Sequence, residues 1–236
     1  MTSRGMVASG FVGLAAIGTI SLALMSQPPA EEVHQDAVQR AVAEAAATEP
    51  VQVASWEAEL SPFDQVMGAE DAPVTIIEYA SFTCGHCANF HTDTLPAIKE
   101  TYIDTGLARY IFRDFPLDGL ALRAGMLARC GRDDQYFGMV DAIFSAQNQW
   151  IRADEPLLAL QRLGSLAGIG PEEFEACMTD EELSNRIIEL RLDAQERFDI
   201  RATPSFVIGG EVVSGHIPFE EFAAMIEAEL PEQPID

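Results

Sequence analysis

The chain of 236 residues has almost no lysine, because Lys99 is the only one among its 14 lysines and arginines. Against these stand 38 aspartates and glutamates, which give a formal net charge of -24 at pH 7. A protein that binds nucleic acid or an anionic membrane surface needs a basic face to meet the phosphates. The composition therefore argues against both partners. It suits a soluble protein that acts on other proteins, although acidity alone indicates only solubility.

Charge is also missing from the first thirty residues, where Arg4 is the only charged side chain and an apolar run covers residues 5–25. A positively flanked apolar segment at the N-terminus predicts export. The run is longer than the usual signal-peptide core of about 7–15 residues, and the stretch 24–26 is a mediocre cleavage site. Residues 1–26 are therefore a signal peptide or, as we favour, an anchor with Arg4 on the cytoplasmic side. We expect the rest of the chain in the periplasm or another extracytoplasmic space, anchored to the inner membrane by residues 5–25 if that segment is not cleaved.

Large apolar side chains are scarce in the next segment. Residues 27–60 hold three prolines and an alanine- and glutamate-rich stretch that offers no broad face to bury. Such a segment predicts a spacer with at most a marginal helix. The folded domain is expected to cover residues 61–236.

Cysteine is sparse too, with four in the chain, and two of them form the pair Cys84-Gly85-His86-Cys87. Export and an even number of cysteines together fit an oxidising compartment. The pair follows a short β-branched segment, 74–79, that predicts a buried strand, and it opens a helical pattern over about 84–103 that Pro96 should kink. A Cys-x-x-Cys where a strand hands over to a helix is typical of a redox site.

The position of each cysteine predicts its chemistry. Free N–H groups and the positive end of the helix dipole favour a thiolate at the helix N-terminus, where cysteine pKa values fall to roughly 3.5–7.5. Cys84 is therefore expected to attack, while Cys87, buried one turn later, should remain a thiol longer and act as the resolving cysteine. Gly85 offers little hindrance to a partner chain, and a protonated His86 would further favour the Cys84 thiolate.

Two other interpretations of the pair remain open, namely an inert disulfide and half of a zinc site. Zinc needs four ligands, usually supplied as two close pairs. Cys130 and Cys177 are isolated in the sequence, and His86 and His91 complete no ligand set. We therefore expect no metal and no cofactor. We expect His91 to lie on the solvent face of its helix.

The remaining pattern predicts an α/β fold. A second strand at 107–113 completes a β-α-β unit, whose two strands should be parallel. A hairpin with a Gly-Gly turn at 209–210 and a closing helix at 218–230 come near the end of the chain. Between these parts the pattern is helical throughout, with helices expected at 121–130, 133–146, 155–166, 171–178 and 181–198.

These pieces, in this order, resemble the DsbA-like branch of the thioredoxin superfamily from Gly68 to about Leu230. The resemblance rests on the run 72–82, the Cys-Gly-His-Cys motif, the second strand with its ending 110–116, the helical stretch and the run 202–206. It implies a thioredoxin fold of βαβ and ββα halves with an all-helical insertion at about 118–197. It also implies the activity of a thiol:disulfide oxidoreductase.

The resemblance assigns roles to residues outside the cysteine pair. Thr203 and Pro204 would pack against the active sulfurs and contact substrate, with the bond before Pro204 in cis. Glu78 would be a buried acid that exchanges a proton with the resolving cysteine; the alternative is a glutamate that ends its strand facing water. Cys130 and Cys177 would form a structural disulfide; the alternative is two separate buried thiols.

The expected function is the introduction of disulfides into substrate proteins that carry free cysteines, with a quinone-linked membrane oxidase as reoxidant. The Gly-His dipeptide is that of protein disulfide isomerase. Since reference potentials run from about −120 mV for DsbA to about −180 mV for that isomerase, we expect an oxidising but not extreme protein. Two alternatives keep the fold: a reductase or isomerase that uses the same site, and a client-binding module without turnover.

Overall fold

The computed structural model describes residues 60–231. The predicted export segment, 1–26, lies outside these residues, as does the predicted linker, 27–60, except for Leu60. Within the described range, no helix combines the length and the apolar character that crossing a membrane requires.

A five-stranded mixed sheet forms the centre of the fold, with strand order β1-β3-β2-β4-β5. Strands β2 (Val74–Ala80) and β3 (Ala108–Asp114) pair in parallel along seven residues, which confirms the predicted β-α-β unit. β4 (Ser205–Ile208) pairs antiparallel with β2, and β5 (Glu211–Ser214) pairs antiparallel with β4. The short edge strand β1 (Gln65–Met67), which lies antiparallel to β3, was not predicted.

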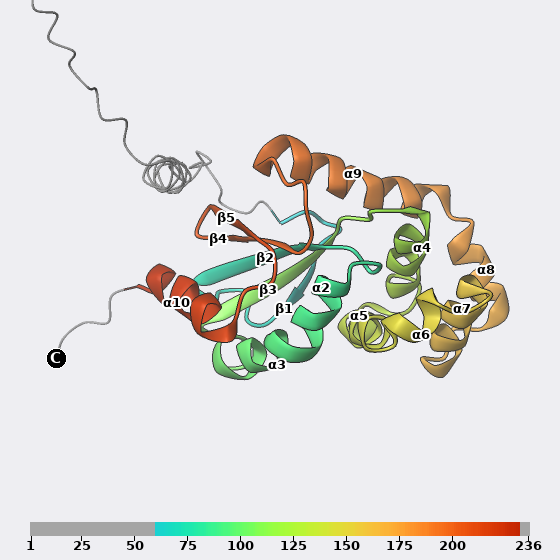
Figure 1. Cartoon of the computed structure of the whole chain (residues 1–236), viewed down its shortest axis with the longest axis horizontal. Coiled ribbons are helices and arrows are strands. Elements are labelled where there is room, and N and C mark those ends of the chain that lie inside the picture. The colour runs from blue at the N-terminus through green and yellow to red at the C-terminus, as the bar shows by residue number, and fades with distance from the viewer. Residues whose placement is uncertain (1–59, 232–236) are drawn as a thin grey trace, which may run out of the picture. The chain divides into compact units, whose positions relative to one another are not determined.

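The central strands are buried on both faces, and their side chains alternate between two layers of the core. Ile77 and Tyr79 of β2 belong to the layer that α9 (Glu181–Phe198) covers. Ile76 and Ala80 belong to the opposite layer, under the helical segment that follows the cysteines. Glu78 lies between Ile76 and Ala80 in the strand, so the alternation directs it into this second layer. Figure 1 shows α9 on one side of the sheet and α2, α3 and α10 on the other.

The helical segment after the cysteines was predicted as one helix kinked at Pro96, but two π-helical turns interrupt it. It consists of α2 (Gly85–Asn89), a π-helical turn at Phe90–Thr94, α3 (Leu95–Ile98) and a second π-helical turn at Lys99–Ile103. Pro96 lies in the first turn of α3, where its missing N–H costs little.

The predicted helical insertion begins after β3, and Figure 1 shows most of its helices gathered beyond one end of the sheet. Asp118 starts the insertion as an N-cap, accepting a hydrogen bond from the Ala121 N–H at 2.8 Å. The helix at 147–151 was not predicted, and a 3-10 turn at 133–135 begins the stretch that had been assigned to one helix. The helices are α4 (Gly119–Ala128), α5 (Tyr136–Ser145), α6 (Gln147–Ile151), α7 (Pro156–Leu166), α8 (Pro171–Met178) and α9.

Two buried ion pairs fasten the end of β3 to its surroundings. Arg113 binds Asp64, just before β1, at 2.7 Å and donates a hydrogen bond to the Tyr79 hydroxyl at 2.8 Å. Asp114 binds Arg129, at the end of α4, at 2.9 Å. Pairs this deeply buried are held in one geometry by hydrogen bonds, so they fix where the insertion leaves the sheet.

The chain closes with the β4–β5 hairpin and α10 (Phe219–Glu229). Gly209 and Gly210 form the hairpin turn with φ angles of 59° and 86°, a combination that glycine adopts without strain. Phe222 of α10 packs its ring edge-on against Phe206 of β4, with 5.0 Å between centroids. α10 thus covers the same face of the sheet as the helical segment after the cysteines, since Phe222 also lies against Phe90 at 5.6 Å between ring centroids.

Candidate redox site

Cys84 is the N-cap residue of α2, at the carboxyl end of β2. Its half-buried thiol donates a hydrogen bond to the Thr203 carbonyl oxygen at 3.3 Å. The pKa of Cys84 is lowered to about 5, chiefly by a hydrogen bond from Cys87, with further contributions from Thr203 and from the backbone N–H groups of residues 86 and 87. Burial opposes this shift but does not cancel it. Much of Cys84 is therefore a thiolate at neutral pH.

Cys87 is fully buried one turn further along α2. Burial raises its pKa well above the usual range, and the hydrogen bond with Cys84 and the charge of Glu78 act in the same direction. Cys87 therefore remains a thiol whose hydrogen stabilises the Cys84 thiolate. The arrangement separates an exposed nucleophile from a buried proton carrier.

The two residues between the cysteines are exposed. A Cβ atom added to Gly85 would meet no atom within 4 Å, so the space beside Cys84 is open to a partner chain. His86 lowers the pKa of Cys84 through its backbone N–H, the route that the free amides of a helix N-terminus provide.

The loop before β4 forms the wall on the other side of Cys84. The Thr203–Pro204 peptide bond is cis, and Pro204 is buried. The Pro204 carbonyl accepts a hydrogen bond from the Gly215 N–H at 2.8 Å, which ties the loop to the end of β5. The Thr203 carbonyl is thereby held against the nucleophilic sulfur, at a sequence separation of 119 residues.

Beneath the cysteines, Glu78 lies in a buried cluster with His91 and Tyr110. Its side chain has no solvent exposure, which excludes the alternative of a glutamate that ends its strand facing water. Its Oε2 atom lies 3.0 Å from Nε2 of His91 and accepts a hydrogen bond from the Tyr110 hydroxyl. The charge of Glu78 contributes to the raised pKa of Cys87, so the carboxylate and the buried thiol interact.

His91 corrects a prediction. We expected it on the solvent face, but its side chain is only 2 % exposed and is stacked on Phe144 with 4.1 Å between ring centroids. The signal was present in the sequence, because His91 follows Cys87 by four residues. Residues so spaced lie on one face of a helix, and Cys87 was already assigned to the buried face.

Sequence reasoning also missed Gln147, the first residue of α6. Its buried side-chain amide donates hydrogen bonds to the carbonyl oxygens of Phe82, at 2.9 Å, and Cys84, at 2.8 Å. The insertion therefore holds the backbone that carries the nucleophile. A lone glutamine in a helical stretch gives no signal of this role.

A second set of polar contacts joins the active turn to the start of the insertion. The Thr83 hydroxyl donates a hydrogen bond to Asp118 at 2.7 Å, and the Leu117 N–H donates one to the Ser81 hydroxyl at 3.3 Å. Together with Gln147, these bonds fix the turn before α2 from two sides.

The other two cysteines, Cys130 and Cys177, form a disulfide between the end of α4 and α8, with 5.8 Å between their Cα atoms. They lie within the helical insertion and hold its helices together. Among residues 60–231, no group of three or more histidine, cysteine, aspartate and glutamate side chains could hold a metal ion.

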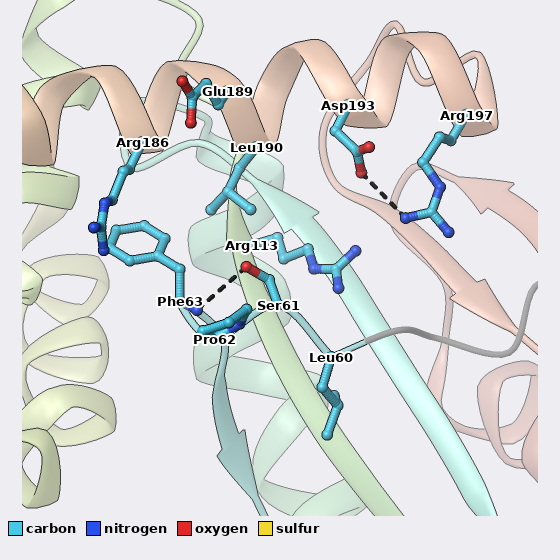
Figure 2. A pocket seen from close by; sticks show the side chains of 10 residues that line it. All are labelled: Leu60, Ser61, Pro62, Phe63, Arg113, Arg186, Glu189, Leu190, Asp193 and Arg197. Carbon is cyan, nitrogen blue, oxygen red and sulfur yellow. Dashed lines mark hydrogen bonds and ion pairs between the residues drawn. The ribbon is translucent and has the colours of Figure 1, made fainter.

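A pocket of about 510 Å³ lies on the α9 side of the sheet (Figure 2). None of the site residues predicted from the sequence lines it. Its arginines are all in ion pairs: Arg197 faces Asp193 at 3.5 Å within the pocket, while Arg113 and Arg186 bind Asp64 and Glu182 outside it. The remaining lining residues are Leu60, Ser61, Pro62, Phe63, Glu189 and Leu190.

Comparisons with known proteins agree with this geometry. The family described as Thioredoxin matches residues 61–228. A Rickettsia bellii protein named, provisionally, a protein-disulfide oxidoreductase is 32% identical over 175 residues, which cover 72% of this chain and 65% of that protein. Disulfide bond formation protein D of Bacillus subtilis is 26% identical, covering 70% of this chain and 76% of that protein.

Comparison with solved structures also finds proteins of the DsbA type. Alpha-DsbA1 of Wolbachia pipientis superposes with a TM-score of 0.68 at 34% identity, covering 72% of this chain and 92% of that one. The present chain thus spans nearly all of that solved chain, but less than two thirds of the Rickettsia relatives, for example 61% of the Rickettsia conorii protein.

Proposed function

Because the chain belongs to the thioredoxin family, in its DsbA-like branch, we propose that it is an exported thiol:disulfide oxidoreductase that introduces disulfides into other proteins. The observation that carries the proposal is the opposite behaviour of the two sulfurs. The pKa of Cys84 is lowered to about 5, and that of its buried partner Cys87 is raised.

In the first step, a substrate thiolate attacks the Cys84 sulfur of the oxidised pair. The Cys84–Cys87 bond breaks, its electron pair passes to Cys87, and that sulfur takes up a proton. The substrate is now joined to Cys84 by a mixed disulfide. Attack at Cys84 is supported by exposure, since Cys84 is half-buried and Cys87 is fully buried.

In the second step, another substrate thiolate attacks the substrate sulfur of the mixed disulfide. The substrate disulfide forms and Cys84 leaves as a thiolate. A thiol of low pKa leaves faster, and a stabilised thiolate also favours the reduced form of the enzyme. Both effects favour the direction in which the substrate is oxidised.

The substrate chain would lie along the Thr203–Pro204 loop. Proline has no N–H, and the Thr203 carbonyl is already 3.3 Å from the Cys84 sulfur. An extended substrate beside Cys84 would therefore be contacted by backbone groups of this loop. Such contacts do not depend on the side chains of the substrate. We propose that substrates are proteins with free cysteines, recognised by this wall and by access over Gly85.

The reduced enzyme must be reoxidised to act again, and we propose a quinone-linked membrane oxidase for this step. We further propose that residues 61–236 form the working domain in the periplasm or another extracytoplasmic space. In this arrangement residues 1–26 serve as the signal peptide or anchor, and 27–60 as the spacer.

Trapping tests the proposal. A Cys87→Ala variant given substrate proteins that carry disulfides should accumulate mixed disulfides through Cys84, because the Cys84 thiolate attacks the substrate disulfide and the internal thiol that would release the substrate is gone. A Cys84→Ser variant should accumulate none. If neither variant loses activity in a thiol-oxidation assay of a reduced model peptide, these cysteines are not the site.

The redox state in the cell decides the direction. A pair found mostly oxidised supports a disulfide donor, whereas a pair found mostly reduced indicates a reductase or isomerase. Wild-type protein that binds thiol-containing clients without turnover would indicate a binding module.

A further inference from the structure

The ring of His91 lies between a buried carboxylate and a carboxylate at the surface. Its Nε2 atom is 3.0 Å from Glu78, and its Nδ1 atom is 3.9 Å from Asp141 on α5, whose side chain is 59% exposed. Within the described structure Nδ1 is buried and has no hydrogen-bond partner. A gap of this length is too wide for a direct hydrogen bond.

A surface cavity of about 440 Å³ reaches this side of the ring. It is lined by His91 and Asp141, with the exposed residues Thr92 and Ser145 at its rim and Lys99 further along. Polar partners and ample room are what an ordered water requires. The cavity therefore brings solvent up to the His91 side chain, whose buried Nδ1 atom is the nitrogen that faces away from Glu78.

The proposed reaction needs such a path, because Cys87 gains or loses a proton each time its disulfide opens or closes. Cys87 and Glu78 are both fully buried. The Tyr110 hydroxyl, also bound to Glu78, has its pKa raised well above the usual range by burial and by the Glu78 charge, so it keeps its proton. Among the groups that contact Glu78, His91 is the one that also borders solvent.

We propose that His91 relays protons between Glu78 and water in the cavity beside Asp141. This inference rests on the proposed function. When the disulfide opens, the Cys87 thiolate takes a proton from Glu78. His91, neutral with its proton on Nε2, takes a proton at Nδ1 from solvent in the cavity, and the imidazolium so formed gives its Nε2 proton to Glu78. When the disulfide closes, the same protons move outward.

The charged groups around the ring suit this role. Burial alone lowers the pKa of His91, but Glu78, from β2, and Asp141, from α5, outweigh it and leave the pKa above its usual value. Tyr110 of β3 faces the same carboxylate, and Lys99 at the cavity is paired with Asp104 at 2.6 Å. The two carboxylates thus let a buried ring accept an extra proton.

The test compares His91→Gln with wild type in rapid-mixing measurements of disulfide opening and closing. Glutamine can still donate a hydrogen bond to Glu78 but cannot pass a proton through its side chain. We expect both rates to fall about 100-fold or more, the range in which proton transfer by a side chain contributes. The reduction potential should stay unchanged, because a relay alters the barrier and not the end states. The matched control, His216→Gln at an exposed histidine, should keep wild-type rates.

A second variant tests proton transfer directly. His91→Gly would remove the ring next to the cavity, and added imidazole should restore the rate with a pH dependence that follows the titration of imidazole. A merely structural role predicts no such rescue. Should the glycine variant fail to fold, Asp141→Asn, at the cavity mouth, decides: a slower rate with an unchanged potential supports the relay.

Two outcomes would overturn the relay. One is a His91→Gln variant with wild-type rates and pH profile. The other is a rate change fully accounted for by a shifted potential, which would make His91 an electrostatic neighbour only. Either result leaves the proposed function intact, whereas wild-type protein without thiol exchange at Cys84 would remove the function itself.

Discussion

Cys84 and Cys87 lie one helical turn apart, yet the pKa of Cys84 is lowered and that of Cys87 is raised. The difference between the two pKa values follows from the groups that surround each sulfur atom. Cys84 meets hydrogen-bond donors, namely the Cys87 thiol, the Thr203 side chain and the free N–H groups at the start of α2, while Cys87 meets an apolar core and the nearby Glu78 carboxylate. Both effects follow from the strand-to-helix junction at which the motif lies.

The first prediction concerns the titration of Cys84. In the reduced protein, the thiolate absorbance should rise with a midpoint near pH 5, and this transition should vanish in Cys84→Ser. Because the folded pKa is depressed, the thiolate stabilises the folded state most above the unfolded pKa, about 8.5, and this stabilisation is lost as the pH falls toward 5.

Urea unfolding of the reduced protein should therefore show stability rising from pH 5 toward pH 9 relative to Cys84→Ser. The oxidised protein, which has no thiolate, is the control and should lack this pH dependence. A midpoint close to that of a free cysteine would show that the hydrogen bonds to Cys84 have no such effect.

Of the residues around the motif, the sequence analysis named Glu78, Thr203 and Pro204 but missed Gln147 and the buried position of His91. Cys84 and Glu78 could be found because one opens a helix and the other interrupts an apolar strand. Gln147 could not, since its contact with the carbonyl of Cys84 depends on how the insertion folds back onto the motif. His91 could have been found from its spacing to Cys87.

At the scale of elements, α6 joins the helical insertion to the active turn. This helix has only five residues, and Gln147 and Trp150 are its buried members. Trp150 anchors it by donating a hydrogen bond from its ring N–H to the Ile143 carbonyl at 2.8 Å. The anchored helix can then hold the Gln147 amide against the two carbonyls before α2.

The second prediction is that Gln147→Glu destabilises the protein by about 1–3 kcal/mol, the cost of leaving buried groups without their partners. The carboxylate has nearly the same shape, but it offers acceptors to the carbonyls of Phe82 and Cys84, which need donors. Urea unfolding measures the change. Gln149→Glu, two residues along at an exposed position, is the matched control and should have little effect. Equal stability of the two variants would contradict the assigned role of Gln147.

Elements with strong periodic patterns were predictable, and short ones were not. The parallel strands β2 and β3 are rich in β-branched and aromatic residues, typical of buried strands. The three-residue β1 exists because β3 offers it an edge, and the π-helical turns reflect how the helical segment packs. Tertiary contacts, rather than the local sequence, determine short elements such as β1 and the π-helical turns.

At the scale of the whole domain, the insertion divides the β-α-β half from the hairpin half that supplies Thr203 and Pro204. The two halves meet through β2, which pairs with β3 on one side and with β4 on the other. The sheet alone therefore brings Thr203 to Cys84. The insertion adds the polar contacts of Gln147 and Asp118 at the active turn, so its stability bears on the geometry of the site.

The third prediction tests what holds the insertion together. The Cys130–Cys177 disulfide spans 47 residues of sequence, from the end of α4 to α8. Closing a loop of that length contributes up to about 4 kcal/mol by restricting the unfolded chain. The double variant Cys130→Ser/Cys177→Ser should lose most of that stability in urea unfolding. The Cys130→Ser single variant should lose a similar amount, because either change opens the same loop. A double variant as stable as wild type would mean that packing of α4, α7 and α8 alone holds the insertion.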